Sequence, residues 1–153
     1  MRQIDPAEPA DFNGLESTFD TVLAINVLEY LDHPAAAVRA MARSLKSGGR
    51  LVTLVPQGPG LYGTLDKVMG HRRRFAAREV RQLLEENGLA VERVMNFNKI
   101  GAPPWRVYSR FLRSNRINKV TLKLFDKTVW LWRRLDRFLP WTGLSLIVVA
   151  VKK

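Results

Sequence analysis

Two short stretches of this chain hold side chains that can take part in catalysis. His71 lies within the run Gly70–Phe75 (GHRRRF), directly before a predicted helix. Histidine changes its charge near neutral pH, so His71 is the best candidate for a general base. Arg73 and Arg74 follow, and a guanidinium binds phosphate or carboxylate through two hydrogen bonds. We predict that His71 is catalytic and that both arginines bind substrate; a solvated basic turn is the alternative.

The second stretch lies at the end of residues 19–26 (FDTVLAIN), an apolar run typical of a buried parallel strand. Open α/β sheets bind ligands at the carboxyl ends of their strands, which is where Asn26 lies. We predict that Asn26 and, three residues on, Glu29 are catalytic. The alternative for Asn26 is an asparagine that caps a loop, and the alternative for Glu29 is a carboxylate at the start of a helix. Tyr62 lies in the loop after the next predicted strand and is predicted to contact substrate.

Apolar periodicity predicts the elements that position these side chains. Strands are expected at residues 19–26, 50–56, 91–97 and 144–151, with a short one at residues 1–4. A helix is expected to begin at Asp32–Pro34, with Asp32 as its cap, and to end at the pair Gly48-Gly49. A second helix is expected over residues 77–87, and the loop 57–70 is expected to hold a helical turn near Leu65.

The alternation of strands and helices predicts an α/β fold with an open, mostly parallel sheet covered on both faces. The last strand follows a long insertion rather than a simple crossover, so we expect it to be central and antiparallel. In the strand over residues 91–97, we expect Val91, Met95 and Phe97 to share one face.

Length and composition limit the class of protein. A chain of 153 residues with 46% hydrophobic and 25% charged residues predicts a single globular domain over residues 1–153. The chain has no cysteine, which excludes a disulfide scaffold and a thiolate zinc site, and we predict no metal site. The longest apolar run, residues 144–151, is too short to span a bilayer. We expect a cytoplasmic protein.

The net charge of +11 is concentrated in residues 104–140, where ten basic residues face only Asp126 and Asp136, a net of +8. Eight aromatic residues are interleaved with these cations between Trp105 and Trp141. We predict that residues 104–140 form a basic, aromatic helical insertion before the last strand. Three interpretations stay open: a cover on the sheet, a helix resting on anionic lipid, and nucleic-acid binding, which lacks a groove-reading motif.

Several motifs resemble those of class I S-adenosylmethionine-dependent methyltransferases. The residues FDTVLAINVLEYLDHP followed by LKSGGRLVTLVP resemble the unit of that fold from its fourth to its fifth strand. The run LYGTLDKVMGHRRRF and the ending WTGLSLIVVAVKK resemble one subgroup, often associated with family 2 glycosyltransferases, in which a GHxRRY motif opens a helix. The resemblance implies a Rossmann-like methyltransferase fold and S-adenosylmethionine as cofactor.

The resemblance also assigns residues and reveals an absence. It implies that Asn26 lies by the transferred methyl group, that Val27 contacts the cofactor, and that Asp5 takes the place of the acid near adenine. Pro6 after Asp5 has no N–H to donate, and Tyr30 replaces the usual histidine. The N-terminal, glycine-rich half of the fold is missing. Residues 58–63 match G-x-G-x-x-G, but Pro59 removes an amide donor, so a substrate-side loop is the preferred interpretation.

The sequence therefore predicts a methyltransferase or a fragment of one, which O-methylates a sugar or a lipid-linked glycan. The alternative is a truncated, non-catalytic module that acts by oligomerisation, as a homodimer, or by binding a membrane surface. The predicted partners are the glycan and, at the inner face of the membrane, anionic lipid; nucleic acid is not expected.

Overall fold

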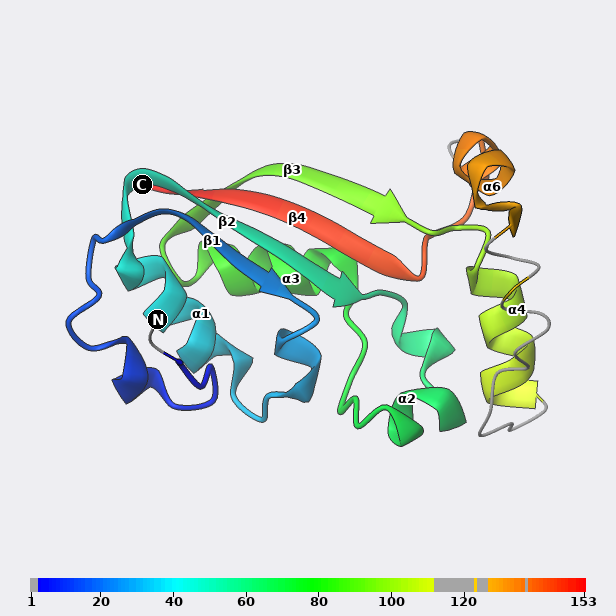
Figure 1. The fold of residues 1–153 in the computed structure, drawn as a ribbon, viewed down its shortest axis with the longest axis horizontal. Helices are drawn as coiled ribbons and strands as arrows, with labels where there is room; N and C mark the ends of the chain where they lie inside the picture. Colours follow the sequence, from blue (N-terminus) through cyan, green and yellow to red (C-terminus); the bar gives the residue numbers. More distant parts are fainter. Residues whose placement is uncertain (1–2, 112–122, 124–126, 137) are drawn as a thin grey trace.

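The fold is built on a four-stranded sheet with the order β1-β2-β4-β3 (Figure 1). The computed structural model describes residues 3–111, 123, 127–136 and 138–153. Its strands are β1 (Phe19–Ile25), β2 (Leu45–Pro56), β3 (Leu89–Phe97) and β4 (Ser145–Lys152). β1 and β2 pair in parallel, and β4 lies antiparallel between β2 and β3. The predicted α/β fold with a central, antiparallel last strand is confirmed.

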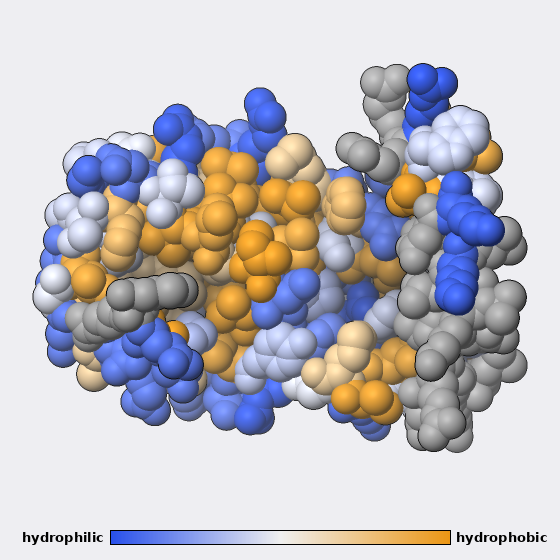
Figure 2. All heavy atoms as spheres, viewed as in Figure 1, coloured by the Kyte–Doolittle hydropathy of each residue, from blue (hydrophilic) through white to orange (hydrophobic). Residues whose placement is uncertain are grey.

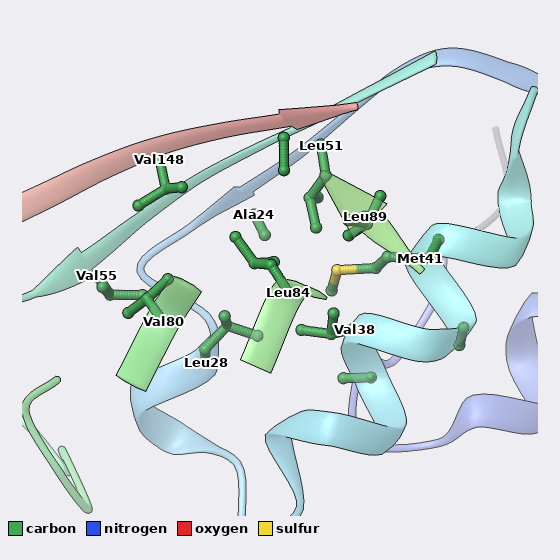
Figure 3. Close-up of a cluster of buried hydrophobic side chains, with 14 of the residues drawn as sticks. Ala24, Leu28, Val38, Met41, Leu51, Val55, Val80, Leu84, Leu89 and Val148 are labelled. Atoms are coloured by element: carbon green, nitrogen blue, oxygen red, sulfur yellow. The ribbon is translucent and has the colours of Figure 1, made fainter. Parts of the chain in front are cut away.

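Helices α1 (Pro34–Ser44) and α3 (Ala77–Glu85) cover one face of this sheet and form the core with it (Figure 3). Alternate strand residues such as Ala24, Leu51 and Val148 point into this layer and are at most 1% exposed. Val38 of α1 and Leu84 of α3 meet them and are completely buried. The apolar stripes predicted for both helices are therefore the surfaces that hold them on the sheet.

The opposite face of the sheet is bare among the described residues, so the prediction that both faces are covered is wrong for them. Leu23 is 66% exposed and Ile25 is 48% exposed. Through the strand register they continue into Val52 and Leu54 of β2, which are half-buried. Figure 2 shows apolar side chains gathered in a band across the middle of the molecule, where Figure 1 draws the strands. We call these four residues, with Ile147 and Val149 of β4, the bare face.

Three local predictions at the start of the chain are corrected. Residues 3 and 4 form no strand. The first residue before α1 is His33, and Asp32 instead pairs with Arg72. α1 ends at Ser44 rather than at Gly48-Gly49, because β2 begins at Leu45 and the two glycines form an irregularity in its pairing with β1.

The predicted face of the third strand is also corrected, because β3 contains a bulge. Val91 pairs with Ala150 while Arg93 pairs with Val149, so one extra residue lies between them. The bulge shifts the alternation by one position. Val91 and Val94 therefore pack against the core, while Phe97 is 51% exposed.

The remaining elements gather beyond the carboxyl ends of β1, β2 and β3 (Figure 1). They are the 3₁₀ segments η2 (Leu28–Tyr30) and η3 (Pro59–Leu61), helices α2 (Thr64–Val68), α4 (Ala102–Arg106) and α6 (Val129–Asp136), and a π-helical turn over Val107–Phe111. A further 3₁₀ turn, η1 (Pro9–Phe12), contacts α1. Residues 112–122, 124–126 and 137 of the predicted helical insertion lie outside the described residues.

The bare face leads to a first testable prediction. Leu23→Lys places a charge on it, and Val68→Lys makes the same change at a similarly exposed site on α2. We expect the unmodified chain to self-associate as its concentration rises, because an apolar face and an unpaired strand edge favour association. Light scattering across a concentration series should show weaker association for Leu23→Lys and no change for Val68→Lys. A clean monomer at high concentration would contradict this expectation.

Candidate functional site

The candidate site is built on the loop 57–75, whose two ends lie side by side. Gln57 and Phe75 form an isolated parallel bridge, and the Gly58 N–H donates to the Phe75 carbonyl at 3.0 Å. The Phe75 N–H in turn donates to the Pro56 carbonyl at 2.9 Å, directly at the end of β2. The loop is thus closed at its base, and its polar side chains are held at the carboxyl edge of the sheet.

Asp66 of α2 is the centre of this loop. Its side chain is completely buried and accepts three hydrogen bonds. Its Oδ1 accepts from Arg74 Nε at 2.8 Å and pairs with His71 Nδ1 at 3.1 Å, and its Oδ2 accepts from the Gly63 N–H at 3.0 Å. A buried carboxylate is stable only when it is paired and hydrogen-bonded, and Asp66 meets both conditions.

Arg74 pairs with Asp66 inside the protein, and its role as a clamp for a substrate anion stays a prediction. Its side chain is only 3% exposed, and it also donates to the Gln57 carbonyl at 3.0 Å. The Trp105 ring lies 4.6 Å from its guanidinium carbon and covers it. Burial lowers the pKa of Arg74, and the charge of Asp66 opposes this shift. The Nε and Nη1 groups of the guanidinium are therefore directed at acceptors inside the protein.

His71 is held on several sides and keeps one ring nitrogen for chemistry. Its Nδ1 faces Asp66, which can only accept, so Nδ1 carries the proton and Nε2 is the basic nitrogen. The Tyr62 hydroxyl donates to the His71 carbonyl at 2.9 Å, and the Tyr30 ring meets the imidazole edge-on with centroids 5.1 Å apart. The side chain is 10% exposed. Sequence reasoning missed Asp66; its only signal is an acidic residue five positions before the histidine.

The structure joins the two stretches that the sequence singled out. The Arg72 N–H donates to the Glu29 carbonyl at 2.9 Å, and its Nε donates to the Tyr30 carbonyl at 2.8 Å. Glu29 is completely buried, and its carboxylate oxygens have no hydrogen-bond partner among the described residues. Burial raises the pKa of Glu29, while its own backbone amide, His71 and Arg74 oppose the shift. Glu29 therefore lies in the same polar cluster as His71.

Other predicted residues lie outside this cluster. Asn26 directly follows β1, is exposed and has a left-handed backbone with φ of 50°, and Val27 beside it is half-buried. Asp5 is exposed and accepts from the Ala7 N–H at 2.8 Å within the N-terminal turn. Arg73 is exposed and donates to the Asp32 carbonyl at 3.4 Å. Of these, Asn26 and Val27 remain at the carboxyl edge of the sheet.

The glycines of residues 58–63 serve local packing. Gly58 has a φ of 80° and precedes η3, and only the five-residue helix α2 follows. A Cβ on Gly63 would collide with Ser109, whose Oγ accepts from the Leu65 N–H at 3.3 Å. This close approach explains a glycine there without a phosphate, and the interpretation of a substrate-side loop stays a prediction.

The described residues do not by themselves fit S-adenosylmethionine. A cofactor of this type needs a glycine-rich turn beside the strand next to β1 and an acid for its ribose hydroxyls. In the described part of the chain no strand pairs with the free edge of β1, and Asp5 lies in a separate turn. Within the same residues, no group of three His, Asp or Glu side chains is arranged to hold a metal ion, and no helix combines the length and apolarity needed to cross a membrane.

Comparison with known proteins identifies the family. Residues 1–94 match the model of a methyltransferase domain. The chain belongs to this methyltransferase domain family. Comparison with curated proteins gives no match. Relatives with solved structures share the fold at low identity.

Three solved structures illustrate that fold. A SAM-dependent methyltransferase from Archaeoglobus fulgidus is 16% identical over 99% of this chain, with a TM-score of 0.59. The [4+2]-cyclase SpnF is 17% identical over 99%, with a TM-score of 0.58. Phosphoethanolamine N-methyltransferase 2 from Haemonchus contortus, in complex with S-adenosyl-L-methionine, is 16% identical over 95%, with a TM-score of 0.52. This chain covers 66%, 56% and 36% of these proteins' own lengths, respectively.

The buried carboxyl of Glu29 predicts a pH dependence of stability. Because its pKa is raised in the folded state, folding takes up a proton, and stability falls as the pH rises above 4.5, the unfolded value. Glu29→Gln removes this loss. We expect urea unfolding to show that the free energy of unfolding of the variant rises relative to that of the unmodified chain between pH 4.5 and 8. The expected rise is about 1.4 kcal/mol for each unit by which the pKa of Glu29 differs between the folded and unfolded states. The difference between the exposed control Glu8→Gln and the unmodified chain should not change with pH in this way. A difference between Glu29→Gln and the unmodified chain that stays constant with pH would contradict the assignment.

The Asp66–Arg74 pair predicts a strong coupling. Asp66→Asn leaves a buried guanidinium without its charge partner and should cost about 3–5 kcal/mol of unfolding free energy. The double change Asp66→Leu with Arg74→Met removes both charges and should recover most of that loss. Asp20→Asn, which breaks an exposed pair with Lys46, should cost at most about 1 kcal/mol. Chemical denaturation of the four proteins checks this, and equal losses for Asp66→Asn and Asp20→Asn would refute it.

Proposed function

We propose that this methyltransferase domain is the acceptor-binding part of an S-adenosylmethionine-dependent enzyme that methylates an oxygen of a sugar or a lipid-linked glycan. The observation that supports it is the pairing of His71 with buried Asp66 at the carboxyl edge of the sheet. An oxygen acceptor usually needs a base to remove its proton, and this edge is where open α/β sheets bind ligands.

In this proposal His71 is the base. Its Nε2 takes the proton of the acceptor hydroxyl. The Nδ1–H group remains hydrogen-bonded to Asp66, and the charge of Asp66 stabilises the resulting imidazolium. Arg74 balances Asp66 from the buried side, and the hydrogen bond of the Tyr62 hydroxyl to the His71 carbonyl fixes the loop. Arg73, an exposed cation two residues after His71, can meet an anionic group of the acceptor.

A complete binding site for the methyl donor needs residues beyond those that the structure describes. Asn26 and Val27 can form one wall of its site at the end of β1, and the free edge of β1 is where the glycine-rich part of the fold would add. S-adenosylmethionine, when bound, supplies a methyl group on a sulfonium. The described residues supply the acceptor side.

Calorimetry with S-adenosylmethionine tests the proposal. We expect no binding by the 153-residue chain and measurable binding when a glycine-rich N-terminal half of the fold is supplied to it. In the binding form, His71→Gln should lower the rate of methyl transfer to a glycan acceptor by on the order of 10²–10⁴-fold. His33→Gln, at the only other histidine, should leave the rate unchanged. Absence of binding in both forms would overturn the proposal.

A second candidate function rests on the bare face. Exposed Leu23 and Ile25 suit a non-catalytic module that acts by association with a second polypeptide. Association without any cofactor binding, in either form of the chain, would favour this function over catalysis.

A further inference from the structure

A second apolar surface lies on α6 and the residues that follow it, away from the sheet. Its exposed members are Val129, Trp130, Leu131, Leu135, Phe138 and Trp141, of which Phe138 is 73% and Trp130 63% exposed. We call this set the α6 patch. Figure 1 shows α6 above α4 at one end of the molecule, separate from the helices α1 and α3 that cover the sheet.

Hydrogen bonds fix which side of α6 faces the body of the protein. Asp136 accepts from the Ile100 N–H at 2.8 Å, so its side of the helix is turned inward. Trp132, one turn earlier, is half-buried on that same side. Trp130 and Arg134 are four residues apart on the other side, and both are exposed. The outward side therefore combines a large aromatic ring with a cation.

The residues after α6 are tied to the same place. Trp141 Nε1 donates to the Lys99 carbonyl at 2.8 Å, and Lys99 Nζ donates to the Leu139 carbonyl at 2.9 Å. Together with the bond from the Ile100 N–H to Asp136, these bonds anchor the chain before and after the exposed Phe138 ring. The apolar groups are thus held outward by a fixed backbone.

The charge around the patch is strongly positive. Lys123, Lys127 and Arg134 are exposed, and residues 104–140 carry ten basic and two acidic side chains. One of the two acidic side chains, Asp136, accepts a hydrogen bond from the Ile100 N–H. Exposed Trp, Phe and Leu beside Lys and Arg are the composition of a helix that lies in a bilayer interface and attracts anionic lipid.

We propose that the α6 patch docks on the surface of an anionic lipid bilayer, with Trp130 and Phe138 inserted at the headgroup level. A second copy of the chain suits the patch less, because two such cationic surfaces repel each other. Nucleic acid suits it less as well, because Val129, Leu131 and Leu135 are aliphatic and offer bases no stacking surface.

Vesicle binding tests this docking directly. All four tryptophans of the chain lie between residues 105 and 141, so intrinsic fluorescence reports on this region alone. We expect phosphatidylglycerol-containing vesicles to shift the emission to shorter wavelength and to co-sediment with the chain, with weaker binding at higher salt. Pure phosphatidylcholine vesicles should bind much less. The absence of binding to anionic vesicles at low salt would overturn the proposal.

Matched variants locate the contact. Trp130→Ser combined with Phe138→Ser should lower the partition coefficient at least tenfold, whereas Phe97→Ser, an exposed aromatic on β3, should leave it unchanged. Arg134→Gln should lower it about fivefold, and Arg78→Gln on α3 should not. Equal binding by the double variant, or binding to an oligonucleotide with none to vesicles, would refute docking through this patch.

Discussion

The buried carboxylate of Asp66 is the interaction on which the functional end of this molecule depends. It holds a guanidinium, an imidazole and a backbone amide at once, and all three come from the loop 57–75. A carboxylate that is removed from water in this way fixes the positions of its partners, because any of them that left would expose an unpaired charge. His71 therefore has an oriented ring on a loop that would otherwise be a solvated basic turn.

A second constraint is that helices cover only one of the two faces of the sheet in the described part of the chain. One face has α1 and α3, and the other presents Leu23 and Ile25 to solvent. The same strand, β1, has a free edge in the described part of the chain. Both features concern β1, whereas the loop 57–75 is closed by its own hydrogen bonds. The likeness to SpnF, a cyclase, agrees with the view that the fold alone does not define the reaction.

The sequence was sufficient where a pattern has one physical meaning. The apolar run at residues 144–151 predicted a central strand, and the long insertion before it predicted the antiparallel direction of β4. The sequence was insufficient where a residue type can have either of two structural roles. Gly48 and Gly49 stop helices in general, but here they bend β2. Arg74 has the chemistry of an anion clamp, and only the three-dimensional position of Asp66 and Trp105 shows that the anion is internal. The bulge in β3 had no sequence signal that we recognised.

The most direct test of this site is the tautomer of His71, read from the ring nitrogen resonances of ¹⁵N-labelled protein at a pH where the imidazole is neutral. With only two histidines, His33→Gln assigns the signals. If Asp66 orients the ring as the structure indicates, the proton will be on Nδ1, and Asp66→Asn will change that preference. A proton on Nε2 in the unmodified protein would contradict the assignment of His71 as a base positioned by Asp66.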